Sequence, residues 1–569
     1  MKEQYNLRFL IISFFIIFLY FLNSILLGKD YYGNHLFLLF SEASRFYNGD
    51  LLYKQIYVTY GIGQTLINAA SLYLFGENTF SLYLIANIFF FLSIFFILLI
   101  CLKLKFSNIE SFFITIILIN ISPALINPWG TYLAYLPIVL SLYFLLNKNK
   151  INLFFSGFLL GVACLIKETI LLTVIIILSY VIFELLFKRD RKVKIQKQYI
   201  LIKFYMSGFL FPVLIFISYM LISNNYLIWV SLIYPSYRES TLAHLGYYIN
   251  PNKDFLREIY LLYIVPFRAI GLVFLKSIYN LWIDWILIFI SYLLSFFIIF
   301  KRLFQNQKWK EVENQKYIFS IISVYCISFI IQNLHIADLM RVATGSILGI
   351  IITNYFLKKV VKQNKIKILI YLSIIFLMFF RSSTFVTWGN NMDLKDFYIL
   401  SAKNIKNSLN IILENKNNFE TFEKVPEFKH MNYDFSTHKF YSDLKNKCIE
   451  IKNNKKIMFS DNHTEIWEAS YFCKTQPLYY FPFTFNNVWI KLFPNTKITD
   501  IYNNKENLDK IEDYTINFYL SENLSVIKDR FGKNINLNDY NIIYTFDLKK
   551  TIIEKTYGNR YFLILQKKE

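Results

Sequence analysis

The sequence has few charged residues and few cysteines for its length. Only 17% of its 569 residues are charged, and five are cysteines. It contains no G-x-x-x-x-G-K-[ST] element, no nucleophile elbow and no H-E-x-x-H pair. ATP-driven transport and serine or zinc hydrolysis therefore have no local support. The sequence also has no C-x-x-C pair and no Cys/His cluster that would offer the ligands of a zinc site.

The cysteines divide by their surroundings. Cys101, Cys164 and Cys326 lie in long apolar stretches, where we interpret them as small packing residues. Cys448 and Cys473 are the only two in the more polar C-terminal part. They either form a disulfide, if that part lies in an oxidising compartment, or remain two unpaired thiols.

Long apolar stretches dominate the chain. Hydrophobic residues make up 55% of the sequence, and the mean hydropathy of +0.38 is typical of a bilayer protein. About eleven stretches are long enough to cross the roughly 30 Å of hydrocarbon in a membrane. No cleavage site follows the first, so we interpret it as a span and not as a signal peptide. The predicted spans are residues 8–27, 80–102, 109–126, 130–147, 151–166, 169–187, 200–222, 278–300, 317–334, 339–357 and 366–381.

The positive charge is concentrated in short gaps between these spans. The net charge is +21, yet residues 382–569 carry only about +3. The gaps at 188–198, 301–316 and 358–367 are rich in Lys and Arg. Because cytoplasmic loops carry such an excess, the pattern predicts a cytoplasmic N-terminus and an outward-facing chain after residue 381. We interpret the charge as a topology signal and expect no nucleic-acid partner.

The outward segments are predicted to contain structure of their own. Residues 33–50 and 255–277 have the pattern of amphipathic helices suited to the membrane interface. Residues 64–76 are too short to span and end at a glycine. After residue 381 the apolar runs shorten to strand length. The predicted fold is a polytopic all-α transmembrane bundle (residues 1–381) with a soluble extracytoplasmic α/β domain (residues 382–569).

The first outward segment contains a series of recognisable elements. Asp30 follows the first span, and Asn48-Gly49-Asp50-Leu51-Leu52-Tyr53, Tyr60-Gly61-Ile62 and Leu74-Phe75-Gly76-Glu77-Asn78 come after it in order. This stretch resembles the first-loop region of GT-C membrane glycosyltransferases, in particular the bacterial protein-O-mannosyltransferase-like branch (glycosyltransferase family 39-like). Ile62 stands where that branch usually has proline after Tyr-Gly.

The resemblance implies transfer of a hexose or pentose from a polyprenyl-phosphate-linked donor, with inversion, on the outer face of the cell (inner) membrane. The implied partners are membrane lipid, that donor, and a lipid, glycan or protein acceptor. Asp30 is then the candidate catalytic base, because a carboxylate can take the proton of an acceptor hydroxyl. A cation beside the leaving phosphate would stabilise its charge. The alternative for Asp30 is an ordinary interfacial acid at a helix end.

Other ionisable residues near the outer boundary are candidate substrate contacts. Lys167 and Glu168 lie between two helices, as a phosphate contact with its partner or as a tight turn. Arg341 lies one turn inside a predicted span, where its guanidinium either binds phosphate or extends to the interface. Tyr60 and Asp50 lie in the resembling stretch and complete the candidate substrate-binding set.

Two acids raise the question of a metal ion. Asp30 and Glu42 could contribute to a divalent cation site, although no ligand spacing indicates one. No other cofactor is predicted. Glu42 and Arg45, at i and i+3, are most simply a surface pair on the amphipathic helix.

Two other functions compete with the transferase. A transporter or flippase of lipid-linked saccharide would also have many spans, but usually shows paired halves with broken helices at the midplane. A non-catalytic membrane scaffold would not need Asp30 or Arg341. Convergence of Asp30, Lys167 and Arg341 on one outward cavity would favour the enzyme.

Overall fold

The computed structural model describes two compact units, each of which is formed by several separate segments of the chain. The first unit comprises residues 1–27, 60–64 and 83–408, and the second comprises residues 28–59, 65–82 and 409–569. The described residues are 7–28, 34–52, 58, 61–123, 125–146, 149–167, 170–187, 195–223, 283–304, 314–329, 339–381, 383–387, 390–396, 398–399, 425–428, 431, 435–454, 459–461, 471–473, 476–477, 515–521, 524, 536–551, 554 and 560–568.

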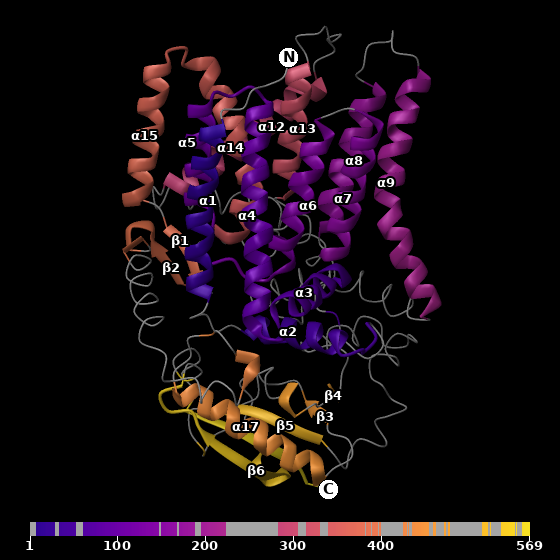
Figure 1. The fold of residues 1–569 in the computed structure, drawn as a ribbon, viewed down its shortest axis with the longest axis vertical. Coiled ribbons are helices and arrows are strands. Elements are labelled where there is room, and N and C mark those ends of the chain that lie inside the picture. The colour runs from indigo at the N-terminus through magenta and orange to yellow at the C-terminus, as the bar shows by residue number, and fades with distance from the viewer. Residues whose placement is uncertain are drawn as a thin grey trace, which may run out of the picture. The chain divides into compact units, whose positions relative to one another are not determined.

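Long apolar helices make up the described part of the first unit. They are α1 (Leu7–Gly28), α4 (Thr79–Lys103), α5 (Asn108–Ile121), α6 (Gly130–Leu145), α7 (Lys150–Ile166), α8 (Ile170–Phe187), α9 (Ile195–Ile222), α12 (Ile283–Phe304), α13 (Asn314–Ser328), α14 (Leu339–Val360) and α15 (Asn364–Arg381). Figure 1 shows α6, α7, α8 and α9 side by side in this bundle. A hairpin of β1 (Ser383–Thr387) and β2 (Asn390–Asp393) follows α15.

Each predicted span coincides with one of these helices, but their lengths differ. Four segments of the described chain are long and apolar enough to cross a membrane: Arg8–Leu26, Thr79–Lys103, Tyr199–Ile222 and Ile283–Phe304. Several of the other helices are shorter apolar segments of 10–17 residues. The described chain is therefore that of a membrane protein, and the number of eleven spans stays a prediction.

Small residues allow close helix packing in this unit. Gly157 of α7 and Gly208 of α9 lie against the backbone carbonyl oxygens of Tyr205 and Phe154, respectively. A Cβ added at either glycine would clash with that backbone. Small residues are the usual means by which helices in membranes approach closely, because burial of apolar surface gives no drive between helices in lipid.

Buried polar contacts add specificity to the same bundle. Ser141 of α6 hydrogen-bonds through its hydroxyl to Ser156 of α7 at 3.0 Å and to Tyr325 of α13 at 2.9 Å. Near the start of α5, Glu110 accepts a hydrogen bond from Lys367 of α15 at 2.9 Å. These contacts fix the relative positions of three pairs of helices that apolar packing alone would leave interchangeable.

The second unit combines short helices with a sheet. Its described elements are α2 (Asn34–Tyr47), most of α3 (Ile62–Phe75), η4 (Pro426–Phe428), α17 (Phe435–Asn454), β3 (Phe459–Asp461), β4 (Gln476–Pro477), β5 (Thr515–Ser521), η6 (Leu537–Asp539), β6 (Tyr540–Asp547) and β7 (Tyr561–Lys567). The strand order is β4-β3-β5-β7-β6, with β3 parallel to β4 and β5, and β7 antiparallel to β5 and β6. A small mixed sheet is therefore present, and a complete α/β domain over residues 382–569 stays a prediction.

The amphipathic helix α2 lies where its sequence pattern predicts it. Its apolar side is buried within the second unit, with Phe37 packed against Phe428 and Phe472. Gly49 ends the helix at φ +102°, and the N–H groups of Gly49 and Asp50 donate to the carbonyls of Phe46 and Arg45. This is the Schellman arrangement that glycine favours after a helix. The similar helix predicted at 255–277 lies outside the described residues.

One disulfide fastens this unit. Cys448 of α17 is bonded to Cys473, with the Cα atoms 4.4 Å apart. Of the two alternatives that the sequence left open, the structure has the disulfide. Residues 471 and 472, next to Cys473, contact α2 through their aromatic rings. The bond therefore fastens to α17 the turn whose aromatic rings contact α2.

Candidate functional site

The first unit contains a buried lysine at the end of α7. Lys167 follows the last helical residue, and its backbone turns to extended geometry (φ −147°, ψ 121°). Only 9% of the residue is exposed. Its Nζ donates a hydrogen bond to Oγ1 of Thr131 at 2.5 Å. A buried ammonium group is costly unless polar or anionic groups surround it, so this lysine marks a site that favours negative charge.

The N-terminus of α6 lies at this lysine. Gly130 and Thr131 open the helix, and Trp129 occupies the N-cap position, where its residue type offers no oxygen acceptor to the first N–H groups. The N-terminal end of a helix carries partial positive charge and exposed N–H donors. Together with Lys167, it gives this part of the unit the chemistry of an anion site, and phosphate is the anion such sites commonly hold.

Glycines let the surrounding backbones come together. A Cβ on Gly61 would lie 2.6 Å from the carbonyl oxygen of Leu165, and one on Gly130 would lie 2.6 Å from Oε1 of Gln64 and 3.1 Å from Cβ of Lys167. Any larger residue would push these segments apart. The Tyr-Gly element of the first outward segment therefore has a packing role at Gly61, directly against the end of α7.

Two side-chain amides lie in the same region. Nε2 of Gln64 donates to the carbonyl of Pro128 at 2.9 Å, whereas Oε1 of Gln64 is buried and has no hydrogen-bond partner among the described residues. Asn127 is 0% exposed, and neither its Oδ1 nor its Nδ2 has a partner within the described part of the chain. The stretch 127–131 thus brings unpaired amide atoms to the region of Lys167. Sequence reasoning did not select Gln64, Asn127 or Thr131.

The remaining predicted site residues of the first unit are only partly described. Asp30, Tyr60 and Glu168 lie outside the described residues. Arg341 lies in the first turn of α14, and its side chain is also outside them. Whether Asp30 and Arg341 share a cavity with Lys167 stays a prediction. Within the described ranges, no three His, Cys, Asp or Glu side chains gather where they could hold a metal ion.

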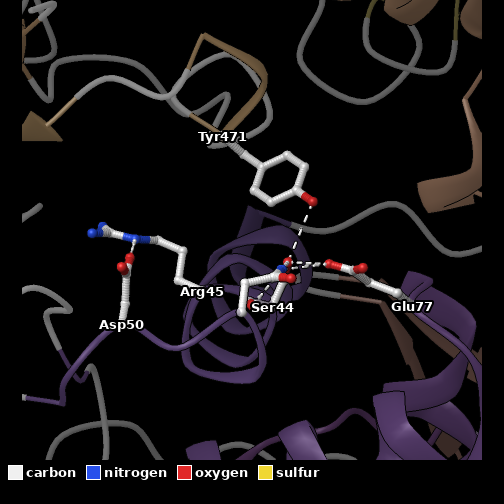
Figure 2. Close-up of polar contacts among 6 residues, drawn as sticks. Ser44, Arg45, Asp50, Glu77 and Tyr471 are labelled. Carbon is white, nitrogen blue, oxygen red and sulfur yellow. Dashed lines mark hydrogen bonds and ion pairs between the residues drawn. The ribbon is translucent and has the colours of Figure 1, made fainter.

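Asp50 lies in the second unit, just past the end of α2. Its Oδ2 accepts a hydrogen bond from Nε of Arg45 at 2.8 Å, as Figure 2 shows. Because the turn at Gly49 directs the chain back towards the last helical turn, this pair forms locally. The pairing gives Asp50 a structural partner, and a role in binding substrate stays a prediction.

The expectation of a surface pair between Glu42 and Arg45 is wrong for Glu42. The residue is only 4% exposed, and its Oε2 accepts a hydrogen bond from Oγ1 of Thr65 in α3 at 3.3 Å. Helix α3 buries polar residues beside apolar ones: Thr65, Asn68 and Leu72 are buried, whereas Leu66 and Tyr73 are exposed. The hydrogen bond from buried Thr65 of α3 gives the buried carboxylate of Glu42 a polar partner.

A second polar cluster joins α2 to the C-terminal part of the chain. Figure 2 shows Tyr471 pointing to Ser44, and the two hydroxyl oxygens lie 3.3 Å apart. Ser44 also donates to Glu77, to which Asn48 donates at 3.2 Å. Burial raises the pKa of the Tyr471 phenol to about 12. The phenol is therefore neutral at physiological pH and serves as a hydrogen-bonding contact, not as a charge.

Comparison with known proteins gives a limited result. No family model and no curated protein matches the sequence. The chain is similar to the solved structure of ArnT from Cupriavidus metallidurans bound to undecaprenyl phosphate, with a TM-score of 0.44 and 9% identity over 83% of this chain and 86% of that one. It is also similar to the apo oligosaccharyltransferase of Archaeoglobus fulgidus, with a TM-score of 0.41 and 11% identity over 84% of this chain and 64% of that one.

Proposed function

We propose that this protein is an integral-membrane glycosyltransferase of the GT-C type. It moves a hexosyl or pentosyl group from a polyprenyl-phosphate-linked donor to an acceptor on the outer face of the membrane. The observation that carries the proposal is the buried ammonium of Lys167 at the N-terminus of α6. A lipid-phosphate donor carries an anion of the kind that binds at the N-terminus of a helix. The resemblance of the stretch from Asp30 to Gly76 supports the same class.

The reaction is a single displacement. The acceptor hydroxyl attacks the anomeric carbon while Asp30 takes its proton, and the bond from that carbon to the phosphate oxygen breaks. The electron pair of the broken bond leaves with the phosphate. Lys167 and Arg341 stabilise the charge that develops there. Attack on the face opposite the phosphate inverts the anomeric configuration.

The disulfide supports the proposed sidedness. Disulfides persist in oxidising compartments and are rare in the cytoplasm. The bond between Cys448 and Cys473 therefore favours an extracytoplasmic C-terminal part. This support is independent of the loop charges, which predict the same side.

Sugar transfer by the purified protein in lipid, with a panel of polyprenyl-phosphate sugars, tests the proposal. We expect transfer from at least one donor, and a loss of about 10²-fold or more in turnover for Lys167→Gln, because one stabilising group at the leaving phosphate is removed. Lys103→Gln is the matched control. That lysine also lies at a helix end, where its Nζ donates to the carbonyl of Tyr143 at 3.3 Å.

The outcomes separate the competing functions. Turnover of Lys167→Gln at the parent rate would refute the phosphate role of this lysine. Movement of the intact lipid-linked sugar across proteoliposomes, without cleavage of its phosphate bond, would support a transporter instead. The same assay, repeated with membrane orientation controlled, shows on which face the acceptor is glycosylated.

A further inference from the structure

The side-chain amide of Asn127 is the least satisfied polar group next to the candidate anion site. It is completely buried, and among the residues that the structure describes neither its donor nor its acceptor has a hydrogen-bond partner. The buried Asn120 of the first unit differs: it donates to the carbonyl of Ile116 at 3.0 Å and accepts from the hydroxyl of Tyr398 at 2.6 Å. Burying an unpaired amide costs folding free energy, and such groups are retained where function needs them.

The position of Asn127 relates it to the anion site. Its carbonyl accepts from the N–H of Trp129 at 2.8 Å, which forms a tight turn directly before α6. Gln64 donates to the next residue, Pro128, and leaves its own Oε1 unpaired. The turn therefore carries the unpaired amide of Asn127 just before the helix end whose next residues contact Lys167, and Gln64 of α3 reaches the same turn with one unpaired atom.

The chemistry of these atoms differs from that of the lysine. Lys167 and the N-terminus of α6 favour an anion, whereas an amide oxygen repels one and instead accepts from a hydroxyl. The amide nitrogen of Asn127 can donate to a neighbouring hydroxyl at the same time. A ligand that satisfies the whole set has an anionic group with neutral hydroxyls beside it. A glycosyl phosphate has this arrangement, and a bare lipid phosphate lacks the hydroxyls.

We propose that Asn127 and Gln64 bind hydroxyl groups of the sugar that is attached to the phosphate held at Lys167. This inference rests on the proposed function for the choice of ligand. It makes the two amides specificity-determining residues, because a site built to hydrogen-bond a hydroxyl discriminates against ligands that lack it. Donor sugar and acceptor glycan offer the same hydroxyl chemistry, and the test below separates them.

The test compares thermal unfolding midpoints of the purified protein with three probes. These are a polyprenyl phosphate, the same lipid phosphate carrying each sugar of the panel, and the corresponding free methyl glycosides. For the parent we expect a larger shift with at least one sugar-bearing lipid than with the lipid phosphate alone. Asn127→Leu should lose this additional shift and keep the shift due to the phosphate. Each lost hydrogen bond should weaken binding of the sugar-bearing lipid by about 2- to 12-fold.

The thermal unfolding midpoint of Asn127→Leu, measured without a ligand, provides a second readout. Asn127→Leu removes an unpaired buried amide, so its midpoint should equal or exceed that of the parent. Asn120→Leu is the matched control, since it removes an amide whose two atoms are both paired. It should have a lower midpoint and retain the sugar-dependent shift. Gln64→Met is the second variant at the site and should also lose that shift.

Three results would overturn the inference: no sugar-dependent shift in the parent, the full shift in Asn127→Leu and Gln64→Met, or a destabilised Asn127→Leu that still binds every probe as the parent does. If the variants lose only the shift caused by the sugar-bearing lipid, the hydroxyl groups belong to the donor. If they also lose a shift caused by the methyl glycosides, the amides bind an acceptor or free sugar as well.

If the shift depends on Asn127 but no sugar is transferred, the sugar-binding site is supported and the transferase proposal fails. If sugar is transferred with unchanged KM in both variants, only the site fails.

Discussion

The buried carboxylate of Glu110 allows a stability prediction with a defined magnitude. Its Oε1 lies 2.9 Å from Nζ of Lys367, and both side chains are less than a tenth exposed. Lys358, 3.8 Å from Oε2, is 45% exposed and contributes little. Oε2 also accepts from the N–H of Ser107 and thereby caps α5. Because glutamine keeps this cap and loses only the charge, Glu110→Gln should lower the free energy of unfolding by about 3–5 kcal/mol.

Reversible unfolding of the purified protein in mixed micelles measures this effect. The double variant Glu110→Gln/Lys367→Met should recover to within about 1 kcal/mol of the parent, since the stranded ammonium is then removed. Glu450→Gln is the control, because Glu450 pairs with Lys447 at 2.7 Å on an exposed helix surface and should cost about 0–1 kcal/mol. A Glu110→Gln variant as stable as this control would refute a buried ion pair between α5 and α15.

Three further predictions test the packing and the second unit. Gly208→Ala should lower the free energy of unfolding by about 1–3 kcal/mol, because its Cβ would meet backbone of α7, whereas the exposed Ser207→Ala should change little in the same measurement. Maleimide labelling of the denatured protein should modify only the three free cysteines until a reductant exposes Cys448 and Cys473; five labelled thiols without reductant would contradict the disulfide. Because the pKa of Tyr471 is raised from 10.0 to about 12, its neutral form favours the folded state, so this contribution is complete below about pH 10 and lost as the pH rises through about 12. The ultraviolet difference between the parent and Tyr471→Phe should show that ionisation near pH 12, and a midpoint near 10 would contradict burial of the phenol.

Helices were predictable where a single physical signal defines them. Apolar length located the helices of the first unit, because a chain in lipid must satisfy its backbone hydrogen bonds within each segment. Amphipathic periodicity at 33–50 predicted α2, and the left-handed preference of glycine predicted the end of α3 before Gly76, which has φ +93°. The strand-length runs at 540–548 and 561–566 correspond to β6 and β7.

The polar contacts were harder to predict because they depend on which face of each helix is buried. The alternation of polar and apolar residues in α3 does not tell which side faces inward, so the burial of Glu42 against Thr65 was missed. Ser44 and Tyr471 are 427 positions apart in the chain, and no local pattern joins them. Lys167 was selected from its charge at a span end, but its partner Thr131 follows only from the packing of α6 on α7. The polar spacing of Gln64 and Asn68 in an apolar helix was a signal that could have been used.

The most direct test of the central claim is the rate of sugar transfer from a polyprenyl-phosphate-linked donor by the purified protein in lipid, compared with that of Asp30→Asn. The substitution preserves size and polarity but removes the group that accepts the proton. The proposed mechanism predicts transfer by the parent and a rate about 10²–10⁴-fold lower in the variant, with donor binding retained. Transfer by Asp30→Asn at the parent rate would contradict the catalytic assignment. The absence of transfer from every donor by a folded parent protein would contradict the glycosyltransferase itself.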